Sequence, residues 1–173
     1  MDKETARRYL RAHLYGALVI GTFVVILPVA VRTLDPLIGA ALPAWLRYVG
    51  AVILPAGAVL SYVSFWLFMT RGRGTAFPDE PPQVLVAAGP YRTVRNPMYV
   101  GNLAMLFGEA LLLASPSLLV YAASMCIVAH VYITRAEEPA LAARYGEPYL
   151  QYLATTPQWV PGAARPISRA AAS

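Results

Sequence analysis

The chain has 173 residues, of which 58% are hydrophobic and only 13% are charged. Soluble domains carry about 45–50% apolar and about 25% charged residues, so this composition excludes a disordered chain and disfavours an ordinary soluble globule. The net charge of +5 comes from basic residues at the edges of apolar runs, which form no continuous patch, so we expect no nucleic-acid partner.

The first two apolar runs are each long enough to cross a membrane. No charged residue occurs over 14–31 or over 48–70, and a span needs about 20 residues. We therefore predict transmembrane helices over about 13–33 and 47–69. The first run is not expected to be a cleavable signal peptide, because it is long, lacks an A-x-A site at its end and is followed by further apolar runs.

The third apolar stretch, residues 98–134, contains Glu109 as its only charged residue. As one helix it would be about 55 Å long, which exceeds the roughly 30 Å hydrocarbon core. Ser115-Pro116-Ser117 marks a turn, so we predict two short helices over 97–114 and 117–136. The expected fold is an all-α integral membrane protein, with residues 1–173 forming a single membrane domain of about four transmembrane helices. Glu109 is either a functional group or a protonated glutamate bonded between helices.

The basic residues set the expected orientation. Twelve of the fourteen lie on one predicted side of the membrane: Lys3, Arg7, Arg8, Arg11, Arg71, Arg73, Arg92, Arg95, Arg135, Arg144, Arg165 and Arg169. By the positive-inside rule, both termini, the loop over 70–96 and an interfacial C-terminal segment over 137–173 are then cytoplasmic.

The loop before the third predicted helix contains the first candidate site. Pro97 suits the first turn of a helix, whose free N–H groups would then face the cytoplasm. Such a helix end attracts a carboxylate or phosphate, and Arg92 and Arg95 would reinforce it. In the alternative interpretation, these arginines anchor the membrane edge and Tyr91 belongs to an aromatic belt.

Glu137 and Glu138, at the end of the fourth predicted helix, form the second candidate site. Adjacent carboxylates at a membrane boundary are unfavourable without partners, so the pair could hold a cation or act as acid and base. His130 lies on the same helix face, but no second histidine is nearby, so we expect no metal site. Alternatively, one glutamate pairs with Arg135 or Arg95 and the other is solvated. Tyrosines at 145, 149 and 152 would share one face of an interfacial helix.

The order of these motifs resembles the isoprenylcysteine carboxyl methyltransferase and phospholipid methyltransferase family, small membrane enzymes that use S-adenosylmethionine. The resemblance rests on Gly89-Pro90-Tyr91-x-x-x-Arg95-Asn96-Pro97-x-Tyr99-x-Gly101, then Glu137-Glu138-Pro139-x-Leu141 and Tyr145-Gly146-x-x-Tyr149-x-x-Tyr152. Gly72-x-Gly74-Thr75 and Trp159-Val160-Pro161 look like bacterial members, so we expect a bacterial cytoplasmic membrane protein.

The resemblance implies a methyltransferase acting on a lipidic or amphiphilic acceptor at the cytoplasmic membrane face. The acceptor would be an isoprenylcysteine-type carboxylate or a phospholipid amine, drawn from membrane lipids or other hydrophobic molecules. It also implies a cofactor pocket between the last two helices and the C-terminal segment, with contacts from Tyr91, Arg95, Asn96, Pro97, Tyr99, Gly101, Glu137, Glu138, Tyr149 and Tyr152. The candidate catalytic residues are Glu138, Arg95, Asn96 and His130.

Two other functions fit parts of the pattern. A membrane reductase with a nicotinamide cofactor would have a broadly similar helix arrangement, although the sequence offers no clear cluster for a 2′-phosphate. A non-enzymatic scaffold or transporter subunit would explain the spans but not the combination of Asn96-Pro97 with Glu137-Glu138. Asn96 replaces a histidine often found in isoprenylcysteine enzymes, so the motif does not identify the acceptor. Nothing in the sequence specifies an oligomeric state.

Overall fold

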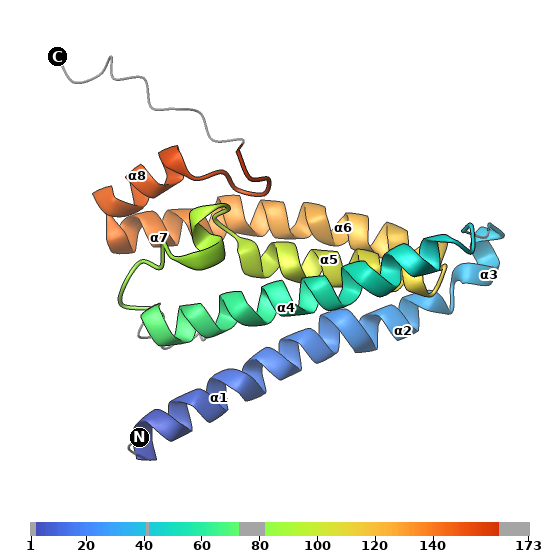
Figure 1. Ribbon diagram of the computed structural model, residues 1–173, viewed down its shortest axis with the longest axis horizontal. Helices are drawn as coiled ribbons and strands as arrows, with labels where there is room; N and C mark the ends of the chain where they lie inside the picture. The colour runs from blue at the N-terminus through green and yellow to red at the C-terminus, as the bar shows by residue number, and fades with distance from the viewer. Residues whose placement is uncertain (1–2, 41, 73–81, 163–173) are drawn as a thin grey trace.

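The computed structural model describes residues 3–40, 42–72 and 82–162, and all regular structure in these residues is helical. The elements, shown in Figure 1, are α1 (Lys3–Ile20), η1 (Gly21–Ile26), α2 (Leu27–Arg32), α3 (Asp35–Ile38), α4 (Leu46–Gly72), η2 (Gly89–Arg92), α5 (Pro97–Leu112), α6 (Pro116–Tyr132), η3 (Ile133–Glu137), α7 (Glu138–Tyr145) and α8 (Glu147–Thr155). The all-α class expected from the apolar runs is confirmed.

Three helical stretches are long and apolar enough to cross a membrane: Tyr9–Arg32, Leu46–Gly72 and Pro116–Tyr145. The chain is therefore an integral membrane protein. The expected count of four spans is not confirmed, because α5 has only 16 residues, or about 24 Å. Its length is limited by Pro97 at its start and by a turn at its end, where Ala114 has a φ of 52°. The last span also continues past the expected end at 136.

Two π-helical segments, η1 and η3, interrupt the long helices immediately before a proline. In η1 the N–H of Leu27 donates to the carbonyl of Thr22, five residues back, and Pro28 follows. In η3 the N–H of Glu138 donates to Ile133 in the same way, and Pro139 follows. In both places a proline, which has no N–H to donate, is the second residue after the π segment. Such single-turn π segments are frequent at functional sites.

Helices α4 and α5 approach each other through four glycines. Gly50 and Gly57 lie on α4, and Gly101 and Gly108 lie on α5, each pair seven residues apart. A Cβ added at Gly57 would lie 2.7 Å from the carbonyl oxygen of Gly101, and one added at Gly101 would lie 2.6 Å from the Ser61 backbone nitrogen. Small residues allow such backbone contact between membrane helices, so these glycines set the position of α5.

Replacing Gly101 with alanine should therefore destabilise the protein. The new Cβ would meet backbone atoms of α4, which cannot rotate away as a side chain can. We expect the free energy of unfolding in detergent micelles to fall by about 1–3 kcal/mol, as for other overpacked sites. Gly21→Ala is the matched control, because nothing lies within 4 Å of a Cβ added there. Equal stability of the two variants would contradict the packing role of Gly101.

Asp35 fastens the α2–α3 turn to the start of α6. Its Oδ1 accepts hydrogen bonds from the Ser115 hydroxyl at 2.8 Å, the Ser117 hydroxyl at 2.6 Å and the Ser117 N–H at 3.0 Å. Burial alone would raise the pKa of Asp35, but the hydrogen bonds from Ser117 and Ser115 outweigh it and lower this pKa. The contact closes the end of the bundle opposite the candidate site (Figure 1).

Asp35→Asn should destabilise the protein by on the order of 1 kcal/mol at neutral pH, because the hydroxyls lose a charged acceptor. The pKa of Asp35 is lower in the folded state than in the unfolded state. Its contribution is therefore present above the unfolded pKa of about 3.9 and is lost as the pH falls through the folded pKa. Melting curves from pH 7 to about pH 2 should show the two proteins converging below the unfolded pKa. A constant difference would contradict this origin.

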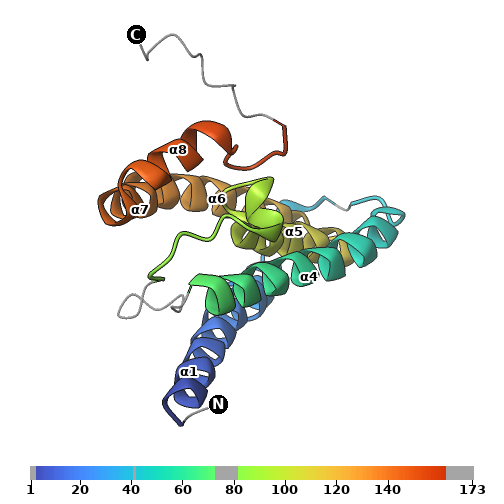
Figure 2. The same ribbon diagram turned by 60° about the vertical axis from the view of Figure 1, so that its left-hand side comes forward.

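The remaining elements gather at the other end of the bundle. Figures 1 and 2 show the start of α1, the end of α4, the yellow-green turn of η2, α7 and α8 at this end, with α8 lying over α7. The motif residues 89–101 and 137–152 therefore come together in space, although the sequence separates them.

Candidate functional site

The site begins at the first turn of α5. Pro97 is fully buried at the first helical position, where its missing N–H has no effect on the helix. Asn96 precedes it with φ −121° and ψ 55°, and its side chain makes no capping hydrogen bond. The Asn96 carbonyl accepts from the N–H of Val100 at 3.0 Å. Pro97 thus takes the first helical position that the sequence predicts, whereas Asn96, with ψ 55°, does not have the extended geometry expected before a proline.

Arg95 connects this turn to the C-terminal helices. Its Nη1 donates to the carbonyls of Leu153 at 3.0 Å and Thr156 at 2.7 Å, and its Nη2 donates to Glu138 Oε1 at 2.8 Å. The Arg95 and Glu138 side chains are only 14% and 18% exposed. This is the Arg95 alternative that the sequence left open for one glutamate. The guanidinium that neutralises Glu138 thus also binds two carbonyls at the C-terminal end of α8.

Glu137 has a different kind of partner. The hydroxyl of Tyr99, one turn into α5, donates to Glu137 Oε2 at 3.0 Å. The π turn of η3 ends at Glu137, and Glu138 begins α7, so the two carboxylates leave the helix on different sides. Glu138 is paired with a cation, whereas Glu137 is paired with a neutral phenol.

Three tyrosines, Tyr91, Tyr149 and Tyr152, form a wall between α4 and α8. The Tyr152 hydroxyl donates to the carbonyl of Tyr91 at 2.6 Å, and the Tyr91 hydroxyl donates to the carbonyl of Ser64 at 3.4 Å. Tyr149 packs against Tyr152 with ring centroids 6.2 Å apart. Burial raises the pKa of Tyr152 to about 12 and raises the pKa of Tyr91 further. These phenols therefore stay protonated near neutral pH and act as hydrogen-bond donors, not as bases.

Three buried nitrogen donors around this wall lack a hydrogen-bond partner within the described residues: Arg95 Nε, Asn96 Nδ2 and Gln158 Nε2. The Arg95 N–H donates to the carbonyl of Pro157 at 2.8 Å, which places residues 95–96 directly beside 157–158. Leaving a buried donor unpaired costs about 1–3 kcal/mol. A cluster of such donors is therefore suited to an anionic group such as a carboxylate.

Three further residues of the predicted motifs take no part in the hydrogen bonds described above. Gly101 packs against the backbone of α4. His130 is exposed, and its ring lies 6.5 Å from that of Trp159. Tyr145 ends α7, and its hydroxyl donates to the carbonyl of Pro82, so it does not share a helix face with Tyr149 as expected. Gly146, with a φ of 62°, separates α7 from α8.

Gln158 and Glu109, which lie outside the motifs, each have a buried polar atom without a hydrogen-bond partner among the described residues. Gln158 was missed because a lone glutamine in a C-terminal segment gives no signal in sequence; only its proximity to Arg95 marks it. Glu109 lies in the last turn of α5, away from the site, and its Oε2 has no hydrogen-bond partner among the described residues.

The Gly74-Thr75 part of the glycine loop lies outside the described residues. Within those residues, no group of three or more metal-binding side chains occurs.

Comparison with known proteins identifies the family. The family model of phospholipid methyltransferases matches residues 45–148, which is more than half of the chain. A search of curated proteins found no significant match. The chain therefore belongs to the phospholipid methyltransferase family, as the motif order indicated. The match covers α4, α5 and α6 together with Arg95, Tyr99, Glu137 and Glu138.

Proposed function

We propose that this member of the phospholipid methyltransferase family transfers a methyl group from S-adenosylmethionine to a lipidic or amphiphilic acceptor at the cytoplasmic membrane face. The observation that carries the proposal is the set of unpaired buried donors Arg95 Nε, Asn96 Nδ2 and Gln158 Nε2, because Arg95 also pairs with Glu138 and donates to the carbonyl of Pro157. We further propose that both termini face the cytoplasm, in agreement with the distribution of basic residues.

The residues present fit the amino-acid part of this cofactor. Its carboxylate would satisfy the unpaired donors of Arg95, Asn96 and Gln158, because charge-assisted hydrogen bonds are the strong ones. Its ammonium would pair with Glu137, whose present partner is a neutral phenol. Tyr149 and Tyr152, which pack against each other, are aromatic side chains of the kind that bind a cation or an adenine ring. When bound, the cofactor supplies a methyl group already activated on a sulfonium.

The protein then has mainly to align the two reactants and to exclude water. Alignment of this kind can contribute about 7–11 kcal/mol to lowering a barrier. Arg95 connects α8 to α7, and Tyr152 connects α8 to η2, so these elements are already joined by hydrogen bonds before the reactants bind. The hydrogen bond from Tyr99 holds the Glu137 carboxylate in one orientation.

The acceptor determines whether a base is needed. An isoprenylcysteine-type carboxylate is already a nucleophile, whereas a phospholipid amine must first lose a proton. His130 is the exposed candidate for that proton, beside Trp159. Glu138 is the other candidate, although its carboxylate is already engaged in a salt bridge with Arg95.

Isothermal titration of the purified full chain tests the proposal. We expect S-adenosylmethionine and its demethylated product to bind, and a reduced nicotinamide dinucleotide not to bind. Membranes incubated with isotopically labelled methyl donor should then yield a labelled lipid that mass spectrometry identifies. A folded sample that binds neither the methyl donor nor its product would overturn the proposal.

A further inference from the structure

A separate cavity lies between α1, α4 and α5. It has a volume of about 330 Å³, at the lower end of the range for small-molecule pockets. Its walls are mostly apolar, with Gly16 and Ile20 from α1, Ala58 and Phe65 from α4, and Met98 and Met105 from α5. Two of these three helices are candidate membrane spans, so a ligand would enter from the hydrocarbon of the bilayer.

The cavity is elongated along the helices. Residues from 13 to 20 of α1 and from 98 to 105 of α5 line it, which corresponds to about 10 Å along each helix. Met98, Asn102 and Met105 share one face of α5 by their spacing. Methionine side chains adapt to irregular apolar ligands. The shape and lining therefore suit one segment of an aliphatic chain.

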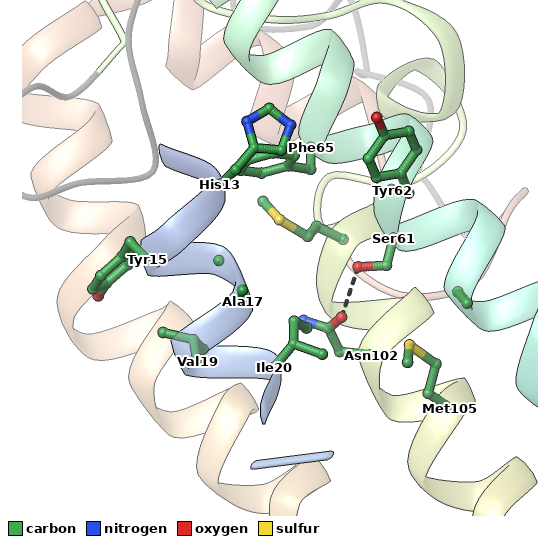
Figure 3. A pocket seen from close by; sticks show the side chains of 13 residues that line it. His13, Tyr15, Ala17, Val19, Ile20, Ser61, Tyr62, Phe65, Asn102 and Met105 are labelled. Atoms are coloured by element: carbon green, nitrogen blue, oxygen red, sulfur yellow. Dashed lines mark hydrogen bonds between the residues drawn. The ribbon is translucent and has the colours of Figure 1, made fainter. Parts of the chain in front are cut away.

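Asn102 places one polar group in this apolar space. The hydroxyl of Ser61 donates to Asn102 Oδ1 at 2.7 Å, which fixes the amide so that Nδ2 is the free end. Within the described residues this Nδ2 has no hydrogen-bond partner. Figure 3 shows the amide between α5 and α1, with its oxygen turned to Ser61. A bound ligand that carries an acceptor oxygen at this depth would satisfy the donor, whereas a pure hydrocarbon would not.

We propose that this cavity binds one acyl chain of an ester-linked glycerolipid, with the ester carbonyl accepting a hydrogen bond from Asn102 Nδ2. An ester joins an acceptor oxygen to an aliphatic chain, which is the combination that the walls and Asn102 require. Binding here needs no methyl donor. The proposal therefore goes beyond methyl transfer and can fail or succeed independently of it.

Native mass spectrometry of the full chain, released from detergent micelles, tests the proposal. The probes are dilauroyl phosphatidylcholine and its ether-linked analogue, which has the same headgroup and chain length but no ester carbonyls. We expect the wild-type protein to retain the ester lipid about 2- to 10-fold better, as one net hydrogen bond predicts. Asn102→Leu should abolish this preference. Equal retention by the wild type, or a preference that survives in the folded Asn102→Leu variant, would overturn the proposal.

A second pair of variants tests the cavity without changing its polar group. Ala58→Leu places extra volume in the cavity, whereas Ala56→Leu places the same volume on an exposed face of α4. We expect retention of both lipids to fall at least several-fold in Ala58→Leu and to stay at the wild-type level in Ala56→Leu. Unchanged retention in Ala58→Leu, or absence of retention in the wild type, would overturn the proposal.

Discussion

Arg95→Ala is expected to lower the free energy of unfolding by about 3 kcal/mol, the lower end of the range found when one partner of a buried ion pair is removed, because this pair is partly buried. The substitution would leave the Glu138 carboxylate without its cation and the carbonyls of Leu153 and Thr156 without their donor. Because these groups lie on α7 and α8, the C-terminal helices should detach from α5 first. Equilibrium unfolding in detergent micelles, together with limited proteolysis of residues 138–155, measures both effects.

Arg92→Ala is the matched control, because Arg92 is exposed and ends η2 three residues earlier. We expect a change within about 0.5 kcal/mol for such a surface position. Arg95→Lys should fall between the two, since an ammonium keeps the charge but not the planar set of donors that reaches two carbonyls and a carboxylate. If Arg95→Ala proved as stable as Arg92→Ala, the assigned bridging role would be wrong.

The long helices were predictable from the sequence because a continuous apolar run of sufficient length is a local property of the chain. The turn at Ser115-Pro116 and the start at Pro97 were also visible in the sequence and account for the shortness of α5. The prolines at 28 and 139 are also a local signal for the π turns. They indicate such a turn only when the helix around them is already known to be long.

The partners within the site could not be predicted in the same way. Arg95 meets Glu138 across 43 residues of chain, and its other acceptors are backbone carbonyls that every residue has. The sequence therefore offered Arg135 and Arg95 as equal partners for a glutamate. Gly101 is a related case, because its motif suggested cofactor contact while the structure packs it on α4. The matching seven-residue spacing of Gly50 with Gly57 was the available signal.

The two adjacent glutamates should differ in their effect on cofactor binding. Glu138 is neutralised by Arg95, whereas Glu137 accepts a hydrogen bond only from the neutral Tyr99 hydroxyl among the described residues. The carboxylate that still lacks a positive partner is the one suited to the cofactor's ammonium. Glu137→Gln should therefore raise the Kd for S-adenosylmethionine about 10- to 100-fold, since a hydrogen bond to a charged group contributes about 1.5–3 kcal/mol.

Glu138→Gln supplies the contrast, because it keeps the shape of the side chain and removes the charge that faces Arg95. We expect it to destabilise the fold by more than Glu137→Gln while changing the Kd of the folded fraction less than about 3-fold, well under the difference of one charged hydrogen bond. Titration calorimetry and unfolding on the same two samples separate the effects. The reverse pattern would move the ammonium site to Glu138, and normal affinity in both variants would reject a role for the acid pair in cofactor binding. The comparison is informative because the two residues share a sequence environment and differ chiefly in the charge of the partner that the fold gives them.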